Sequence, residues 1–248
     1  MNIRDENVLR ELNLYPLWVR RGTPVAEAPA PVAETQAVCR LGGGEADTQQ
    51  PAVMGIATLD PSYVSSLDWP HLKAQVKDCT ACKLRAGCTQ TVFGVGDEKA
   101  EWLFVGEGPG ADEDVQGEPF VGQAGKLLDN MLAAIKLKRG NNVYIANIVK
   151  CRPPNNRTPE PDEIATCMPY LQQQIALIKP KLIVALGKTA ATSLLGRDAT
   201  LGSLRGTLHD YHGTPLIVTY HPAYLLRSPA EKAKAWQDLC FAVQRMSE

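Results

Sequence analysis

The 248-residue sequence lacks any apolar run long enough to span a bilayer, and its first stretch, MNIRDENVLRELNLYP, alternates charged and apolar residues. A secretory signal peptide and a transmembrane helix both require an unbroken apolar segment. We therefore predict a cytoplasmic protein with no membrane association. A charge excess is also missing, because 26 basic residues stand against 27 acidic ones, so overall charge neither indicates nor excludes a nucleic-acid partner.

The sequence offers no even set of cysteines from which a disulfide framework could be built. Its seven cysteines are an odd number, and a cytoplasmic protein keeps its thiols reduced. Metal binding or catalysis is the preferred interpretation, and burial as small apolar side chains is the alternative for some of them. Cys240 fits burial, because it lies beside Trp236, Leu239 and Val243 in a predicted C-terminal helix. The others are Cys39, Cys79, Cys82, Cys88, Cys151 and Cys167.

Large apolar residues are scarce between positions 22 and 62, where five prolines and a run of three glycines occur. This composition predicts a disordered linker over residues 22–66. The preceding residues 1–21 are predicted to form a short helical element with an apolar face, which either docks on the main domain or binds a protein partner. Residues 67–248 form the predicted main domain.

Acidic residues are absent between positions 136 and 157, although six basic residues occur there. A solvated surface is the simplest interpretation of such a stretch. The basic residues are Lys136, Lys138, Arg139, Lys150, Arg152 and Arg157.

Short apolar segments alternate with longer amphipathic ones throughout the main domain. Strands are predicted at 101–108, 142–149, 181–187 and 214–220, each too apolar to be half exposed. Helical stripes follow at 127–135 and 164–178, and two further helices follow Gly187 and Ser228. The pattern predicts an α/β fold, a three-layer α/β/α sandwich around a central four-stranded, mostly parallel sheet.

Chemistry is expected just after these strands, because ligands of parallel sheets bind at the carboxyl ends of the strands. All four strand exits are expected at one rim. The first exit, GEGPGADEDVQGEPFVGQAG, carries five carboxylates within twelve residues and no lysine or arginine, which disfavours a phosphate site. Such carboxylates suit a metal ion, a general base or a developing cation, as in glycosidic bond cleavage. A solvated acidic loop is the alternative.

Three other side chains belong to the same rim. Phe120 could stack on a flat ligand from its glycine-rich loop or pack into the core. Asn147 ends a buried strand, where its amide either pairs within the protein or reads a base edge. His221 follows another strand and could be structural. Their convergence with the carboxylates favours a ligand site.

The cysteine spacing suggests a metal centre. Cys79 and Cys82 form a C-x2-C pair, while Cys151 and Cys167 are farther apart, in a loop and a helix. Four thiolates can hold a structural zinc ion or an iron-sulfur cluster, and spacing alone leaves both open. The split second pair favours a cluster. A thioredoxin-like role is disfavoured because the C-x2-C pair does not follow a strand.

Five ordered motifs, CTACKL, TVFGVGD, GEGPGADEDVQGEPFVGQAGKLLD, NIVKCRPPNNRTP and HPAYLLR, resemble the family 4 uracil-DNA glycosylases over roughly residues 70–246. The resemblance implies a monomeric enzyme of base excision repair that flips uracil out of DNA and hydrolyses its N-glycosidic bond, leaving an abasic site. It also implies a [4Fe-4S] cluster, while Cys88 is an extra thiol. The implied ligands are Cys79, Cys82, Cys151 and Cys167.

The resemblance also implies how uracil is bound. Phe120 would stack on the base, and Asn147 would pair with its O4 and N3–H. Backbone N–H groups of residues 106–108, namely Gly106, Glu107 and Gly108, would hold O2. Glu113 would line the pocket where a thymine methyl group would clash.

For catalysis, His221 would donate a hydrogen bond to O2 as negative charge develops there. Glu107 is the candidate to orient the attacking water, and Asn156 is a second candidate, because better-known uracil glycosylases have aspartate where this sequence has Gly108. In HPAYLLR, Leu225 would wedge into the gap left by the flipped base and Arg227 would contact phosphate.

Three alternatives remain at this stage. A non-catalytic iron-sulfur or zinc DNA-binding module would share the cysteines but tolerate Glu107→Gln and Asn147→Ala. A relative that bonds covalently to uracil carries an arginine-rich loop with a histidine, which is absent between Lys150 and Cys167. A nucleotide-binding enzyme is disfavoured by the acidic loop.

Overall fold

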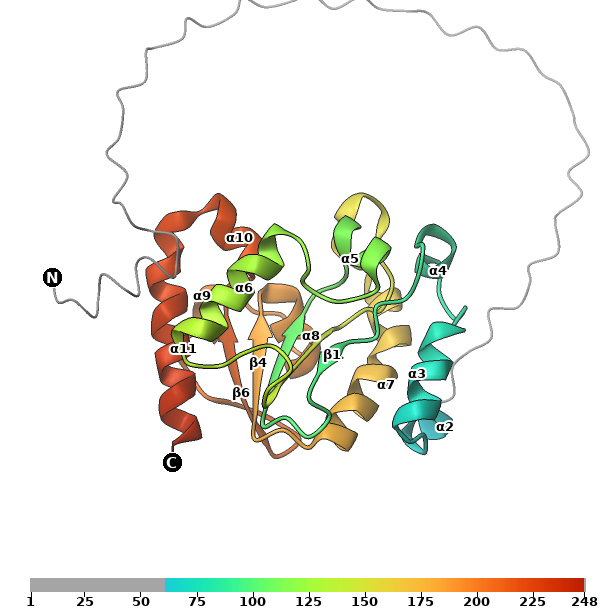
Figure 1. Ribbon diagram of the computed structural model, residues 1–248, viewed down its shortest axis with the longest axis horizontal. Coiled ribbons are helices and arrows are strands. Elements are labelled where there is room, and N and C mark those ends of the chain that lie inside the picture. The colour runs from blue at the N-terminus through green and yellow to red at the C-terminus, as the bar shows by residue number, and fades with distance from the viewer. Residues whose placement is uncertain (1–60, 248) are drawn as a thin grey trace, which may run out of the picture. The chain divides into compact units, whose positions relative to one another are not determined.

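The computed structural model describes residues 61–247, in which helices cover both faces of a sheet (Figure 1). No helix in this range is long and apolar enough to cross a membrane. The strands are β1 (Val95–Gly96), β2 (Trp102–Gly106), β3 (Val143–Asn147), β4 (Leu182–Leu186), β5 (His209–Tyr211) and β6 (Thr214–Thr219). The helices are α2 (Pro61–Ser65), α3 (Trp69–Lys77), α4 (Leu84–Gly87), α5 (Ala111–Gln116), α6 (Gln123–Ala134), α7 (Pro161–Ile178), α8 (Lys188–Leu195), α9 (Leu201–Leu204), α10 (Pro222–Arg227) and α11 (Lys232–Met246), with 3-10 turns η1 (Pro154–Asn156) and η2 (Pro229–Glu231).

The sheet contains six strands in the order β1-β3-β2-β4-β6-β5. The four central strands run parallel, as predicted, and β1 and β5 pair antiparallel at the two edges. The prediction of four strands was wrong because the edge strands contain two and three residues, too few to show an alternating pattern. In the β2–β3 register Gly106 lies opposite Asn147, so these two strands end side by side at one rim.

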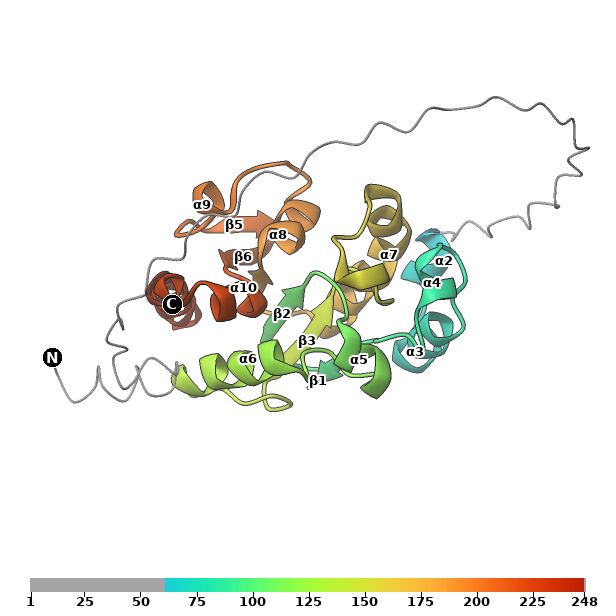
Figure 2. The same cartoon turned by 90° about the horizontal axis from the view of Figure 1, so that it is seen from above.

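Alternate residues of the central strands face two separate hydrophobic clusters, which gives the fold its three layers. Leu103 and Ile183 pack with apolar residues of α3, α7 and α8. Phe104 and Val184 pack on the opposite face with residues of α6, α10 and α11. Figure 2 shows these two groups of helices on either side of the sheet. The predicted α/β/α sandwich is therefore confirmed, and both faces of its sheet are covered.

The described residues begin inside the predicted linker. Residues 61–65 form α2 rather than linker, and Val64 is fully buried where α2 packs on α7. The folded domain thus starts before the predicted boundary at residue 67. The predicted helical element 1–21 and the linker residues 22–60 lie outside the described residues.

The C-terminal helix α11 exposes Cys240, which corrects the prediction that this thiol is buried. The buried positions of α11 include Ala235, Leu239 and Ala242, spaced three and four residues apart. Cys240 lies about 100° of helical rotation beyond Leu239 and so leaves the buried face.

Candidate functional site

A cleft of about 570 Å³ lies at the carboxyl-terminal rim of the sheet, where ligand binding was predicted. It is lined by residues 107–113 after β2, by parts of 153–158 after β3 and of 221–227 after β6, and by the loop between α5 and α6. The exit of β4 contributes no lining residue. Three of the four predicted strand exits therefore meet in one cleft.

Asn147 lies in this cleft with only 2% of its surface exposed. Its backbone carbonyl accepts a hydrogen bond from Lys150 Nζ at 2.9 Å, whereas its side-chain Oδ1 is buried and has no partner among the described residues 61–247. A buried acceptor without a donor costs about 1–3 kcal/mol of folding free energy. Such a group in a ligand cleft is suited to accept a hydrogen bond from a ligand.

Phe120 presents its ring to the same cleft from the loop between α5 and α6. Its backbone is left-handed, with φ 56°, a conformation that costs a non-glycine residue about 1–3 kcal/mol. The ring lies 5.4 Å from the His221 ring, centroid to centroid. Gly106 packs closely against both the Phe120 ring and the Asn147 side chain. A Cβ added at Gly106 would come within 2.5 Å of the Phe120 ring and 2.4 Å of Asn147 Oδ1. Gly106 thus supports the site without lining the cleft, while Glu107 and Gly108 line it.

His221 lies two residues after β6, at the N-cap of α10, and the surroundings of its imidazole determine its protonation state. The pKa of the imidazole is lowered to about 4, mainly by its burial and also by the positive charge of Arg227, while Glu113 acts in the opposite direction. Its Nδ1 accepts a hydrogen bond from the Ala223 N–H at 3.2 Å. The imidazole is therefore neutral at pH 7, with its proton on Nε2 available to donate.

The two acidic candidates have different surroundings. Glu113 accepts three backbone hydrogen bonds, from Gly110 at 3.0 Å, Val121 at 2.9 Å and Gly122 at 3.1 Å. Its carboxylate holds the loop that carries Phe120, in addition to lining the cleft. The half-buried Glu107 carboxylate, by contrast, has no hydrogen-bond or ion-pair partner within residues 61–247. Glu107 is thus free to contact a water or a ligand.

Asn156 also lines the cleft, from the exposed turn η1. Its Oδ1 accepts a hydrogen bond from Arg152 Nε at 2.8 Å. The oxygen is thus engaged, so Asn156 is the less suited of the two candidates to accept a proton from water.

Helix α10 corrects one predicted DNA contact. Leu225 is 1% exposed and packs in the core with residues of α6 and α11, so its insertion into DNA would require it to leave this core. Its neighbours Tyr224 and Leu226 are 40% and 44% exposed. The exposed Arg227 lines the cleft, where a phosphate contact was predicted.

The four predicted metal ligands, Cys79, Cys82, Cys151 and Cys167, line one small cavity with apolar walls. The Lys150 backbone N–H donates to Cys167 Sγ at 3.3 Å. Within residues 61–247 no three His, Cys, Asp or Glu side chains are placed to hold a single metal ion. Four cysteine thiols that share one cavity are a donor set used both by structural zinc ions and by iron-sulfur clusters.

Burial raises the pKa of the Cys167 thiol to about 12 and raises that of Cys151 as well, with the thiol of Cys88 adding to the effect on Cys151. Cys88 therefore lies close to Cys151, although it does not line the cavity. Arg85 donates to the Cys88 carbonyl at 3.3 Å and fixes this segment.

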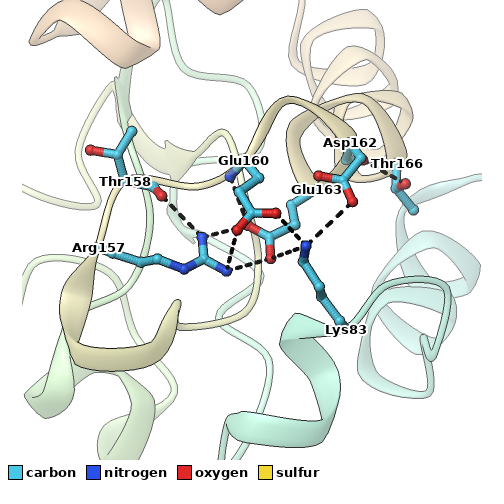
Figure 3. A network of polar contacts seen from close by, with 7 residues as sticks. All are labelled: Lys83, Arg157, Thr158, Glu160, Asp162, Glu163 and Thr166. Atoms are coloured by element: carbon cyan, nitrogen blue, oxygen red, sulfur yellow. Dashed lines mark hydrogen bonds and ion pairs between the residues drawn. The ribbon is translucent and has the colours of Figure 1, made fainter. Parts of the chain in front are cut away.

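A network of charged side chains connects Lys83, the start of α7 and Arg157, as Figure 3 shows. Glu163, fully buried at the start of α7, forms two hydrogen bonds with Arg157, at 2.7 and 2.8 Å. Lys83, next to Cys82, forms ion pairs with Glu160 and, at 3.9 Å, with Glu163. Arg157 lines the cleft, so the network links the C-x2-C segment, α7 and the rim loop.

Sequence reasoning missed the role of Lys150, which was assigned to the solvated surface. Its side chain is buried and donates to the Asn147 carbonyl and, at 2.6 Å, to Gln174 Oε1. Burial lowers its pKa to about 8. The only signal in the sequence was its position between Asn147 and Cys151, two residues already singled out.

Comparison with known proteins identifies the family. The model of the uracil DNA glycosylase superfamily matches residues 93–240. A type-4 uracil-DNA glycosylase of Pyrobaculum aerophilum is 44% identical over 70% of this chain and 92% of its own length. The type-4 enzyme of Thermotoga maritima is 46% identical over 64% of this chain and 84% of its own length. That of Archaeoglobus fulgidus is 45% identical over 67% of this chain and 86% of its own length. The chain therefore belongs to the type-4 uracil-DNA glycosylases of the uracil DNA glycosylase superfamily.

Proposed function

We propose that this protein removes uracil from DNA by hydrolysing the bond between the base and the deoxyribose. The observation that carries the proposal is the buried Oδ1 of Asn147, which has no partner within residues 61–247 and lies in the cleft that Phe120 and His221 also line. Uracil can supply the missing donor through N3–H, and its O4 can accept from the amide nitrogen of the same side chain.

The same groups explain selection against cytosine. Cytosine has an acceptor at N3 and a donor at its exocyclic amine, the reverse of uracil, so its pairing with a fixed Asn147 would leave polar groups unpaired. Each unpaired group costs about 1–3 kcal/mol. Stacking on Phe120 holds the flat base in place and adds no discrimination between pyrimidines.

In the proposed reaction, water attacks C1′ while the bond from C1′ to N1 breaks and its electron pair leaves with uracil. Glu107 orients the water, accepts its proton and favours the cationic sugar. His221 donates from Nε2 to uracil O2, where the negative charge develops. The neutral state and the tautomer of His221 suit this role.

For DNA binding, we propose that Arg227 contacts a backbone phosphate and that Leu226 and Tyr224 occupy the gap left by the flipped base. Their exposure beside the cleft supports this assignment over the buried Leu225. Apolar or aromatic residues inserted between base steps offset part of the energy of unstacking.

We also propose that Cys79, Cys82, Cys151 and Cys167 hold a [4Fe-4S] cluster, as their shared cavity and the family relationship suggest. Once bound, the cluster would cross-link three chain segments and supply no redox step, because hydrolysis transfers no electrons. The residues around it position the rim loop next to Asn147.

The test is incubation of the purified protein with an oligonucleotide containing one uracil, followed by alkali. We expect strand cleavage at the uracil, none in a matched thymine oligonucleotide, and a large loss of cleavage in Asn147→Ala and Glu107→Gln. A folded protein with its visible absorbance intact that gives no cleavage contradicts the proposal. Such a result favours a non-catalytic DNA-binding module, whereas wild-type activity in both variants contradicts the roles proposed for Asn147 and Glu107.

A further inference from the structure

We infer that Arg139 is a positioning residue for uracil binding, because it fixes the backbone from which the Phe120 ring enters the cleft. The inference rests on the proposed function. Arg139 lies after α6 in the basic stretch that sequence reasoning assigned to solvated surface. Its side chain is instead 79% covered, being 21% exposed, and it faces the Phe120 loop.

The guanidinium group of Arg139 binds two consecutive carbonyls of this loop. Nη1 donates to the Pro119 carbonyl and Nη2 to the Phe120 carbonyl, each at 2.7 Å. Asp129 on α6 orients the guanidinium by accepting from its Nε at 3.0 Å. Lysine could not replace this planar arrangement of donors, because an ammonium group lacks the fixed fork geometry.

This contact matters because Phe120 has an unfavourable backbone. A left-handed φ of 56° persists in a non-glycine residue only when the surrounding structure enforces it. The Phe120 carbonyl also lies against Gly125, where an added Cβ would come within 1.8 Å of its oxygen. Arg139 therefore holds the carbonyl in a position that α6 tolerates only because residue 125 is glycine.

Glu113 holds the other side of the same turn. Its carboxylate accepts from the N–H groups of Val121 and Gly122, so the carbonyls before this point are bound by Arg139 and the amides after it by Glu113. The position of the Phe120 ring is thus fixed by two side chains of opposite charge, which bind the backbone of its loop on either side. Arg139 does not line the cleft, so it acts on the base only through Phe120.

The experiment measures uracil excision by Arg139→Ala and Arg139→Lys, with Lys138→Ala as the matched control. Lys138 is an exposed neighbour whose loss removes the same charge without touching the loop. We expect kcat/KM to fall by up to about 10²-fold in Arg139→Ala, the scale of misplacing a site by a remote mutation. Millimolar guanidinium restores part of this rate, and Lys138→Ala retains wild-type activity.

Two further measurements separate positioning from general destabilisation. In a Phe120→Ala background, Arg139→Ala causes little additional loss, because its effect passes through the absent ring. Amide hydrogen exchange of residues 117–123 accelerates in Arg139→Ala, while exchange in α11 does not change.

Wild-type activity in a folded Arg139→Ala variant overturns the inference, and so does an equal loss in the Phe120→Ala background. A wild-type protein that excises no uracil contradicts the proposed function instead. In that case the hydrogen exchange result still decides whether Arg139 fixes the Phe120 loop.

Discussion

At the residue scale, the polar groups of the cleft divide into those bound by the protein and those left open. Glu113 uses both carboxylate oxygens within the fold, while Glu107 has no side-chain partner in the described part of the chain. The Asn147 carbonyl is bound by Lys150, which leaves its side chain available. His221 accepts a hydrogen bond at Nδ1, and its Nε2 has no protein partner within residues 61–247. The open groups are those that the proposed reaction requires, and the bound groups hold them in position.

Gly106→Ala tests how closely the base-binding side chains are packed. A Cβ would lie 2.4 Å from Asn147 Oδ1 and 2.5 Å from the Phe120 ring, so both must move. We expect uracil excision to fall at least about tenfold, together with a loss of about 1–3 kcal/mol in unfolding free energy from overpacking. Gly202→Ala is the control, because its Cβ meets no atom within 4 Å. Equal activity in Gly106→Ala and wild type would contradict this packing.

The lowered pKa of His221 predicts that the stability of the protein depends on pH. Its folded-state pKa of about 4 lies below the unfolded value of about 6.5, so the unfolded chain binds the proton first as pH falls. Stability from this residue is present above pH 6.5 and is lost between pH 6.5 and 4, by up to about 3 kcal/mol. Nitrogen-15 NMR should show the neutral Nε2–H tautomer down to about pH 5. Titration near pH 6.5 would contradict the lowered pKa of His221 and the pH dependence of stability that follows from it.

At the element scale, the predictable parts were those whose residues carry a repeating pattern over several turns. The apolar strands and the stripes of α6 and α7 have such patterns, and the structure confirms them. The six-residue α10 is too short to reveal which leucine faces inward, so Leu225 was misassigned. The contacts of Lys150 and Arg139 were not predictable either, because each depends on a partner brought close only by the tertiary fold.

The charged network at the start of α7, centred on Glu163, is predicted to stabilise the fold and to hold the rim loop. Glu163→Gln removes the buried charge that pairs with Arg157, so we expect Tm to fall by several degrees and KM for DNA to rise as the rim loop loosens. Lys181→Ala is the control, since the Lys181–Glu101 pair is largely exposed and distant from this network. Calorimetry and steady-state kinetics measure the two effects. Unchanged Tm and KM in Glu163→Gln would show that the network does not position the rim.

At the scale of the whole molecule, the cysteine cavity and the cleft are connected through the same two elements, the end of β3 and helix α7. Cys151 follows β3 four residues after Asn147, and Cys167 lies on α7, which also carries Glu163. A group bound by all four thiols would therefore join the start of the domain to the strand that presents Asn147. Metal binding of this kind contributes to folding free energy, because the unfolded chain has no preformed site.

The proposed cluster predicts different results for two neighbouring cysteines. Cys82→Ser removes one of the cavity-lining thiols, so we expect loss of the visible absorbance of the cluster and a lower Tm. Cys88→Ser leaves all four lining thiols in place, so we expect the absorbance to remain. Absorption spectra and iron content of the purified variants decide between these outcomes. A colourless wild type without iron would contradict the cluster.

The central claim is that Asn147, buried beside Phe120 and His221, selects uracil in DNA for excision. The most direct test is a single-turnover measurement of free uracil released from a uracil-containing duplex by wild type and by Asn147→Ala. We predict release by wild type and a rate about 10²-fold lower in the variant, as two buried hydrogen bonds to the base are lost. We also predict no decrease in Tm, because the lost oxygen has no partner within residues 61–247. Equal release by both proteins, or none by wild type, would contradict the claim.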